Sequence, residues 1–443
     1  MKTSFDFTLY QSRCETLGTL MPSSSLLLLQ AAPEVIRNRD AHYPYRQDSH
    51  FFYLTGFEEP EAILILLKSK EGNLERHLLC RSKNEEREIW EGFRWGPEAA
   101  KERFGFNHTS SIETLNEHIK PLLESTEHLY LNLSAFLSPF EVNTPLSLQH
   151  NFNALLQRLR RYGHALHIHD AIPFIEALRR TKAPQEIELM RKAAHISAHA
   201  HIKAMQATQP GRYEYEIEAV LTQHFLANGS HSPAYSSIVA GGANACVLHY
   251  RDNSAPLNDG DILLIDAGCE YAYYASDITR SFPVNGRFSG AQRDLYTLVL
   301  NAQETAIQHL KPGLRWEEYQ TITLRKVVEG LKDLKLCEGS VDGIIESGDF
   351  KRFYMHRAGH WLGLDVHDAG SYFEPSGESI ALTPGMLLTV EPGCYVRPDD
   401  KVPPAFWNIG IRIEDDVLIT ESGCEVISAE VPKKISDIEA VMN

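Results

Sequence analysis

The feature that most constrains this chain is a strand-like segment, residues 261–286 (DILLIDAGCEYAYYASDITRSFPVNG), in which Asp266 and Asp277 lie among apolar and aromatic residues. Its composition and its closing Asn-Gly pair predict an antiparallel hairpin. A turn centred between Tyr271 and Ala272 would place the two aspartates opposite each other. Their Cβ atoms would then be about 4.5–5.5 Å apart, a distance at which like charges destabilise a sheet.

A second pair of segments repeats this arrangement. LLTVEPGCYV carries Glu391, and GIRIEDDVLIT carries Glu414. The two glutamates face each other if the connecting loop is centred between Val402 and Pro403, within the loop-like sequence RPDDKVPPAF. Four carboxylates on one sheet face must either share protons or enclose cations, and two divalent ions would neutralise them. A single acid could lie on a solvated edge strand. The same pattern of opposed acids occurs in two apolar hairpins, however, and this favours a metal site.

Histidines near these hairpins could add a nitrogen ligand. FYMHRAGHWLGLDVHD contains His356, His360 and His367, and GGANACVLHY contains His249. Any one of them could be a packed core residue, but the position of His356, His360 and His367 between the acidic segments favours a ligand. His249, at the end of an apolar run, is a further candidate. Carboxylates with one imidazole form a hard donor set that suits Mn²⁺ or Mg²⁺, and Co²⁺ or Fe²⁺ are also compatible.

Another histidine pair, His195 and His199, has the i, i+4 spacing of zinc ligands on a helix. Glu188, Lys192 and Lys203 fall on the same helical stripe, opposite an apolar one. We therefore interpret this pair as part of a solvated helix face.

Length and charge bound the class of protein. The chain has 443 residues, enough for two or three domains of about 100–200 residues. A net charge of −16 argues against binding to nucleic acid or to an anionic membrane. No segment reaches the ~18–20 apolar residues of a membrane span. Seven cysteines without a C-x-x-C pair predict no disulfide framework and a cytoplasmic location.

Two parts with different patterns follow one another along the chain, with a boundary near residues 172–180. The first mixes helices, one of them expected over residues 143–162, with strand-like segments such as SSSLLLLQAA, AILILLKS and HLLCRS. The second repeats two helices followed by strands: helices over 184–207, 213–228, 288–310 and 315–334, and strands over 233–240, 261–283, 385–396 and 409–419. This order predicts an α+β fold with a curved, mainly antiparallel sheet in the second part.

Several segments of the chain together resemble a known protein family. LLIDAGCEYAYYASDITRSFPV, HWLGLDVHD, LTVEPGCYV and GIRIEDDVLIT together resemble the pita-bread metallopeptidases, and most closely the bacterial-type aminopeptidase P family. YPYRQDSHFFYLTGFEEPEAILIL and EIWEGFRWG resemble the N-terminal domain of that family. The resemblance implies an N-terminal α/β domain, residues 1–175, and a catalytic pita-bread domain, residues 176–443. One departure is the run RAG at 357–359, where the family carries a Gly-Leu-Ser-like sequence.

The resemblance also implies a dinuclear metal centre, usually with two Mn²⁺ ions. Its ligands would be Asp266, Asp277, His360, Glu391 and Glu414. Asp277 and Glu414 would bridge the two ions. The implied activity is release of the N-terminal residue from peptides with proline in second position, by a hydroxide that bridges the ions. The alternatives are an Xaa-Pro dipeptidase (prolidase) and, in another class, a catalytically inactive peptidase-like binding module.

Further roles come from the same resemblance. The catalytic residues would be Glu391, as general base, with His249 and His367, and the substrate-binding residues would be His356, Arg412, Tyr395 and Trp90. Trp90 would reach the active site of a neighbouring subunit, in a homo-oligomer of two or four chains. Other interpretations are packing roles for His249 and His367, an ion pair from Arg412 to Glu414 or Asp415, and a local core position for Trp90.

Overall fold

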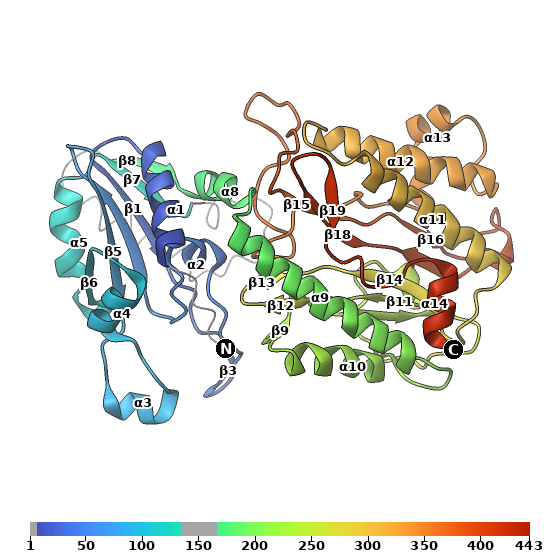
Figure 1. Cartoon of the computed structure of the whole chain (residues 1–443), viewed down its shortest axis with the longest axis horizontal. Helices are drawn as coiled ribbons and strands as arrows, with labels where there is room; N and C mark the ends of the chain where they lie inside the picture. Colours follow the sequence, from blue (N-terminus) through green and yellow to red (C-terminus); the bar gives the residue numbers. More distant parts are fainter. Residues whose placement is uncertain (1–6, 134–165) are drawn as a thin grey trace. The chain divides into compact units, whose positions relative to one another are not determined.

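The structure is a computed structural model that describes residues 7–133 and 166–443 (Figure 1). The chain divides into two compact units, Lys2–Arg179 and Arg180–Asn443. The helix expected over residues 143–162 lies outside the described residues. Among the described helices, none combines the length and the apolar character needed to cross a bilayer.

The first unit is built on a mixed sheet whose described strands run in the order β6-β5-β4-β1-β7-β8. Strands β1, β4 and β5 are antiparallel neighbours, whereas β6 runs parallel to β5, and β7 and β8 run parallel to β1. The strands are β1 Ser25–Gln30, β4 Ile63–Lys68, β5 Leu74–Cys80, β6 His108–Ser111, β7 His128–Leu131 and β8 His167–Asp170; β2 Ile36–Asn38 and β3 Ala41–His42 form a separate small hairpin.

The first unit also contains six described α-helices, and apolar residues of the strands form its hydrophobic core. The helices are α1 Phe7–Leu20, α2 Ser49–Thr55, α3 Glu85–Glu91, α4 Gly96–Phe104, α5 Leu115–Glu124 and α8 Ile172–Arg179. Leu26, Ile65, Leu79 and Leu129 are all buried in one cluster. The predicted strands in SSSLLLLQAA, AILILLKS and HLLCRS are therefore confirmed as β1, β4 and β5.

The second unit contains two pairs of packed helices with strands between them (Figure 1). The helices are α9 Pro184–Ala207, α10 Glu214–Ala227, α11 Gly290–His309, α12 Trp316–Asp333, α13 Val341–Ser347 and α14 Ile435–Met442. The four long helices match the predicted spans closely because each has clear end signals. For example, α9 begins at Pro184, and the side chain of Glu186 accepts a hydrogen bond of 2.8 Å from the Ala183 N–H.

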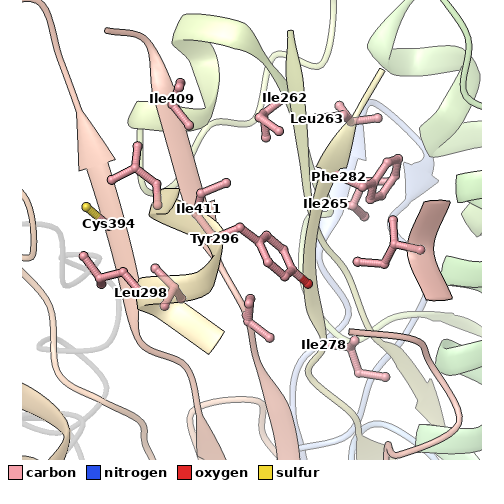
Figure 2. Close-up of a cluster of buried hydrophobic side chains, with 14 of the residues drawn as sticks. Ile262, Leu263, Ile265, Ile278, Phe282, Tyr296, Leu298, Cys394, Ile409 and Ile411 are labelled. Carbon is pink, nitrogen blue, oxygen red and sulfur yellow. The ribbon is translucent and has the colours of Figure 1, made fainter. Parts of the chain in front are cut away.

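Antiparallel strand pairs form the centre of this unit. The strands are β9 Ser232–Pro233, β10 Ile238–Gly241, β11 Ile262–Asp266, β12 Cys269–Tyr271, β13 Tyr274–Ala275, β14 Thr279–Pro283, β15 Leu387–Val390, β16 Gly393–Val396, β17 Ile409–Arg412, β18 Asp415–Ile419 and β19 Cys424–Val426. Apolar side chains from β11, β14 and β17 pack against helix α11 in one large core cluster (Figure 2). Ile265, Phe282, Ile411 and Tyr296 are fully buried there.

The predicted register of the second acidic hairpin is confirmed. Val390 pairs with Asp415, and Gly393 pairs with Arg412. The pairs on both sides keep one register, so Glu391 and Glu414 come opposite each other as expected. The turn of this hairpin is therefore centred between Val402 and Pro403, in the loop between β16 and β17, as predicted.

The predicted register of the first hairpin is wrong by two residues. Asp266 pairs with Thr279 rather than with Asp277. The turn lies on Ala272 and Tyr273, both with positive φ (51° and 72°), which is the backbone of a tight two-residue hairpin turn. Because side chains alternate with a period of two, this shift leaves both aspartates on the same face of the sheet.

Candidate metal centre

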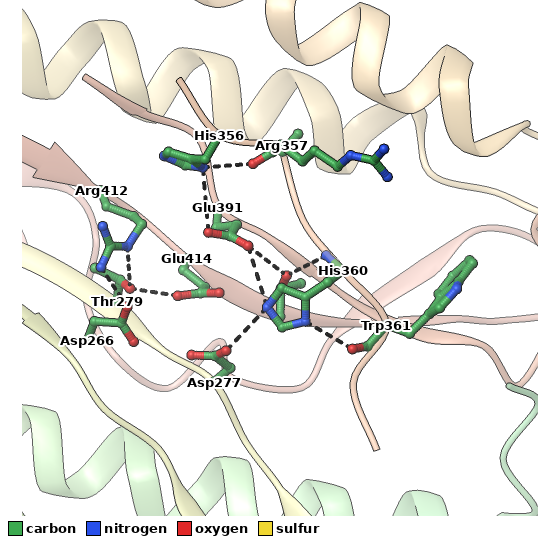
Figure 3. Close-up of polar contacts among 12 residues, drawn as sticks. Asp266, Asp277, Thr279, His356, Arg357, His360, Trp361, Glu391, Arg412 and Glu414 are labelled. Carbon is green, nitrogen blue, oxygen red and sulfur yellow. Dashed lines mark hydrogen bonds and ion pairs between the residues drawn. The ribbon is translucent and has the colours of Figure 1, made fainter. Parts of the chain in front are cut away.

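The four predicted acids meet at one place in the second unit (Figure 3). Asp266 ends β11 and Asp277 precedes β14, whereas Glu391 follows β15 and Glu414 lies between β17 and β18. A backbone bridge between Thr279 and Glu414 joins the two hairpins, with a Glu414 N–H···O distance of 3.1 Å. The strand ends therefore bring together acids that are up to about 150 residues apart in the chain.

His360 faces these carboxylates. Its Nε2 atom lies 3.4 Å from Asp277 Oδ2 and 3.5 Å from Glu391 Oε1. Its Nδ1 atom lies 2.9 Å from the carbonyl oxygen of Trp361, which can only accept, so Nδ1 carries a proton in this contact. A ring held in this way directs Nε2 toward a metal, the arrangement typical of ligating histidines. Ligand atoms of Asp277, His360 and Glu414 all lie within 4.8 Å of one another.

The carboxylates repel one another in a buried position. Burial raises the pKa of Asp277, and the charge of Asp266 raises it further. Burial and the charge of Asp277 raise the pKa of Glu414 well above its ordinary value. Burial raises the pKa of Glu391 to about 7, although the neighbouring His360 lowers it. Such a cluster is stable as a fully ionised set only when positive charge enters it.

Asp266 has a different environment from the other acids. Its Oδ2 atom accepts a hydrogen bond of 2.6 Å from Arg412 Nη2, and its Oδ1 atom accepts one of 2.6 Å from the Tyr235 hydroxyl. Burial raises the pKa of Asp266, but Arg412 and Tyr235 outweigh this effect and hold the pKa below its ordinary value. Arg412 therefore pairs with Asp266, rather than with the acids Glu414 or Asp415 considered from the sequence.

The donor set fits divalent cations. Four carboxylates supply hard oxygen ligands, one imidazole supplies nitrogen, and the backbone fixes the orientation of that imidazole. Bound cations would also remove the mutual repulsion that raises the pKa values of Asp277, Glu391 and Glu414.

A cavity of about 410 Å³ opens over this centre. His249, His356 and His367 line it together with the acids and His360. The rings of His360 and His367 meet edge to face, with centroids 4.4 Å apart. Burial, followed by the neighbouring His360, lowers the pKa of His367 to about 4, so this ring is neutral at physiological pH.

The predicted pocket residues form a connected chain. The hydroxyl of Tyr395 accepts a hydrogen bond of 2.8 Å from Arg412 Nη1 and lies 2.9 Å from His356 Nε2. Tyr395 is fully buried, and the cavity is lined by its two partners rather than by Tyr395 itself. Tyr395 thus holds His356 and Arg412 from behind the cavity wall.

Trp90 lies in the first unit, in the short helix α3. Its side chain is 83% exposed, and its neighbour Ile89 is 80% exposed. The alternative interpretation made from the sequence, that Trp90 is a local core residue, is therefore wrong.

Three further residues at the site were missed from the sequence. The Tyr235 hydroxyl bridges Asp266 and Asp277, at 2.6 and 2.5 Å. Thr279 donates a hydrogen bond of 2.6 Å to Glu414, and Asp416 accepts the backbone N–H of Asp277 at 3.2 Å. Tyr235 and Thr279 carry no distinctive spacing, whereas the pair DD at 415–416 was a visible signal, because two consecutive acids in a buried strand need partners.

Comparison with known proteins defines the class of this protein. Residues 188–421 match the model of Metallopeptidase family M24, and residues 10–130 match that of the aminopeptidase P N-terminal domain. The chain therefore belongs to metallopeptidase family M24. This finding confirms the resemblance stated from the sequence.

Particular relatives cover almost the whole chain. The Xaa-Pro aminopeptidase of Haemophilus influenzae is 44% identical over 98% of this chain and 96% of its own length, and that of Escherichia coli is 41% identical over 98% and 97%. A solved structure of E. coli aminopeptidase P, zinc-substituted and in complex with product, has a TM-score of 0.91 at 40% identity and covers 99% of both chains. The predicted fold class, an α/β N-terminal domain and a pita-bread domain, is confirmed.

Proposed function

We propose that this protein is a metal-dependent aminopeptidase that releases the N-terminal residue from peptides with proline in second position. The observation that carries this proposal is the convergence of Asp266, Asp277, His360, Glu391 and Glu414 at the base of one cavity. Full-length relatives named Xaa-Pro aminopeptidase, at 41% and 44% identity, support the substrate class. We assign the chemistry to residues 176–443 and the N-terminal domain to residues 1–175.

The five residues would hold two divalent ions, and we propose Mn²⁺ because four carboxylates with one imidazole form a hard donor set. Two such ions, when bound, supply a nucleophile from water at neutral pH and polarise the scissile carbonyl. Asp277 and Glu414, the most buried of the four acids, would be shared between the ions.

Glu391 would act as the general base. Its carboxylate lines the cavity, with Oε1 3.5 Å from Nε2 of His360, so it borders the space that the substrate and the attacking water would occupy. The carboxylate would take a proton from the attacking water and deliver it to the departing proline nitrogen. This delivery is needed because an amide nitrogen is a poor leaving group as an anion.

His249 and His367 would stabilise the oxygen of the scissile carbonyl. Both line the cavity beside the acids, and a neutral His367 can donate a hydrogen bond where negative charge develops. His356 and Arg412 would shape the pocket on the proline side, and Tyr395 would hold both of them in place.

Assembly and location are part of the same proposal. The exposed Trp90 and Ile89 on α3 favour a homo-oligomer of two or four chains in which Trp90 reaches a neighbouring active site. All seven cysteines of the chain are free thiols, which favours the reducing cytoplasm.

The test uses the Mn²⁺-loaded protein and three peptides: Xaa-Pro-Xaa, Xaa-Pro and Xaa-Ala-Xaa. We expect cleavage of the first peptide at its N-terminal bond, and a loss of about 10²–10⁴-fold in kcat for Glu391→Gln. Circular dichroism and metal content serve as controls for folding and loading of the variant. Cleavage of the dipeptide alone would identify a prolidase, and metal binding without any cleavage would identify a binding module.

A further inference from the structure

A second group of metal-ligand side chains lies in the first unit, on the sheet formed by β5 and β6. Glu75 and His77 are two residues apart on β5 and therefore share one face of the strand. His108 begins β6 and pairs directly with His77 in the parallel register. Ligand atoms of these three side chains lie within 4.8 Å of one another.

Two of the distances in this group match the spacing between ligand atoms in a metal site. His77 Nε2 lies 3.2 Å from Glu75 Oε2, and His108 Nε2 lies 3.5 Å from the same oxygen. In a tetrahedral zinc site with metal–ligand distances of 2.0–2.2 Å, two ligand atoms are about 3.4 Å apart. A cation could therefore bind among these three atoms with little movement of the side chains.

A fourth residue holds the buried histidine in orientation. His77 Nδ1 lies 3.0 Å from His118 Nε2, on helix α5, and His118 Nδ1 lies 3.4 Å from the Ser110 hydroxyl. Ligating histidines typically contact a second group through the ring nitrogen that does not bind the metal. The contact with His118 thus leaves His77 Nε2 facing Glu75 and His108.

Burial and charge at this position also favour a cation. The side chain of His77 is only 6% exposed, whereas Glu75 and His108 are about half exposed, so the site is open to solvent on one side. The Nε2 atoms of both histidines lie close to the carboxylate of Glu75, and its negative charge would attract a cation to this position. The similar cluster of His195, His199 and Glu430 is about half exposed in all three side chains and contains no comparably buried ligand.

We propose that Glu75, His77 and His108 form an additional metal site for a borderline divalent cation such as Zn²⁺, separate from the centre in the second unit. Two imidazoles and one carboxylate are the ligand types that zinc prefers over Mn²⁺, and water would complete the coordination. Because His108 begins β6, which is the edge strand of the described sheet, the bound ion would cross-link this edge to β5.

The test counts zinc ions per chain by mass spectrometry after equilibrium dialysis of the full-length protein. We expect His108→Gln to bind one zinc ion fewer than the wild type. His108 is exposed, so this variant should fold, and circular dichroism in chelator checks that it does. His309→Gln, an exposed histidine on α11, is the matched control and should retain the wild-type count.

Two further measurements separate a metal site from a local hydrogen-bonded cluster. His118→Phe should weaken zinc binding at this site by about 10–100-fold, as expected for loss of an outer partner. Zinc should also slow amide hydrogen exchange in β6 of the wild type but not of His108→Gln. An unchanged zinc count in His108→Gln, or β6 exchange that does not respond to zinc, would overturn the proposal.

Discussion

At the scale of single residues, His201 is a histidine that the fold keeps neutral close to the centre. This histidine on α9 is completely buried, and its Nε2 atom lies 2.8 Å from the carbonyl oxygen of Ala267, next to Asp266. Burial lowers the pKa of His201 to about 4, and the nearby Arg280 adds to the effect. The folded protein therefore contains a neutral imidazole at pH values where an unfolded chain would carry a proton.

This difference predicts a pH-dependent contribution to stability. Between the unfolded pKa of about 6.5 and the folded value, the unfolded chain binds more protons, so the free energy of unfolding falls as pH drops. From pH 7 to pH 4 the loss from this residue should be about 3 kcal/mol. Urea unfolding in chelator should show that His201→Gln loses less stability over this range than the wild type does. An equal loss in the two proteins would contradict the assignment, and His309→Gln should behave like the wild type.

At the scale of elements, Gly268 allows the two backbone segments that carry Asp266 and Asp277 to lie close together. It lies opposite Asp277 in the hairpin, and a Cβ atom added here would lie 1.8 Å from the carbonyl oxygen of Ser276. No side chain fits at that distance, so the backbone of the hairpin must move when any other residue is introduced.

Gly268→Ala should therefore reduce both stability and metal affinity. We expect a loss of about 1–3 kcal/mol in the free energy of unfolding, as for overpacking of a core, and weaker Mn²⁺ binding because Asp277 is displaced. Denaturant unfolding and calorimetric titration measure the two effects. Gly290→Ala is the matched control: a Cβ atom there meets nothing within 4 Å, and its effect should stay within about 0.5 kcal/mol. Normal Mn²⁺ affinity in Gly268→Ala would show that the hairpin tolerates the added atom.

At the scale of the whole molecule, the two compact units have separate cores. Leu26, Ile65 and Leu129 belong to a cluster in the first unit, whereas Ile265, Ile411 and Tyr296 belong to one in the second. The proposed dinuclear centre draws its ligands from the second unit alone. A ligand stabilises only the part of a protein that must fold in order to bind it.

Calorimetry of the Mn²⁺-loaded protein should therefore resolve two unfolding transitions. In protein loaded with Mn²⁺ in the absence of zinc, chelator should lower the midpoint of one transition and leave the other unchanged, because only the second unit holds Mn²⁺ to lose. The loss should be about 2.7 kcal/mol for each ion, or roughly 5 kcal/mol for two, if each ion is initially present at 100 times its Kd. A single transition, or equal shifts of both, would show that the two units unfold together.

The long helices and the four acids of the centre could be predicted from the sequence. The apolar periodicity and end signals of α9 to α12 are local properties, so these helices were predicted within two residues of their observed ends. The second acidic hairpin was predicted in the correct register. The four acids that converge on the centre were selected because carboxylates in apolar strands need a compensating charge, and that requirement is visible without coordinates. The family resemblance singled out His360 among the three histidines of its segment.

How these groups meet depends on contacts between distant segments, which the sequence does not reveal. The register of the first hairpin depends on the positive φ angles of Ala272 and Tyr273, which neither residue type predicts. Tyr235, which bridges two of the acids, comes from a segment with no recognisable pattern. The pairing of His77 with His108 depends on a parallel strand contact between distant parts of the chain. Local sequence determines which way a strand or helix presents its side chains, but contacts between distant segments depend on the packing of the whole unit.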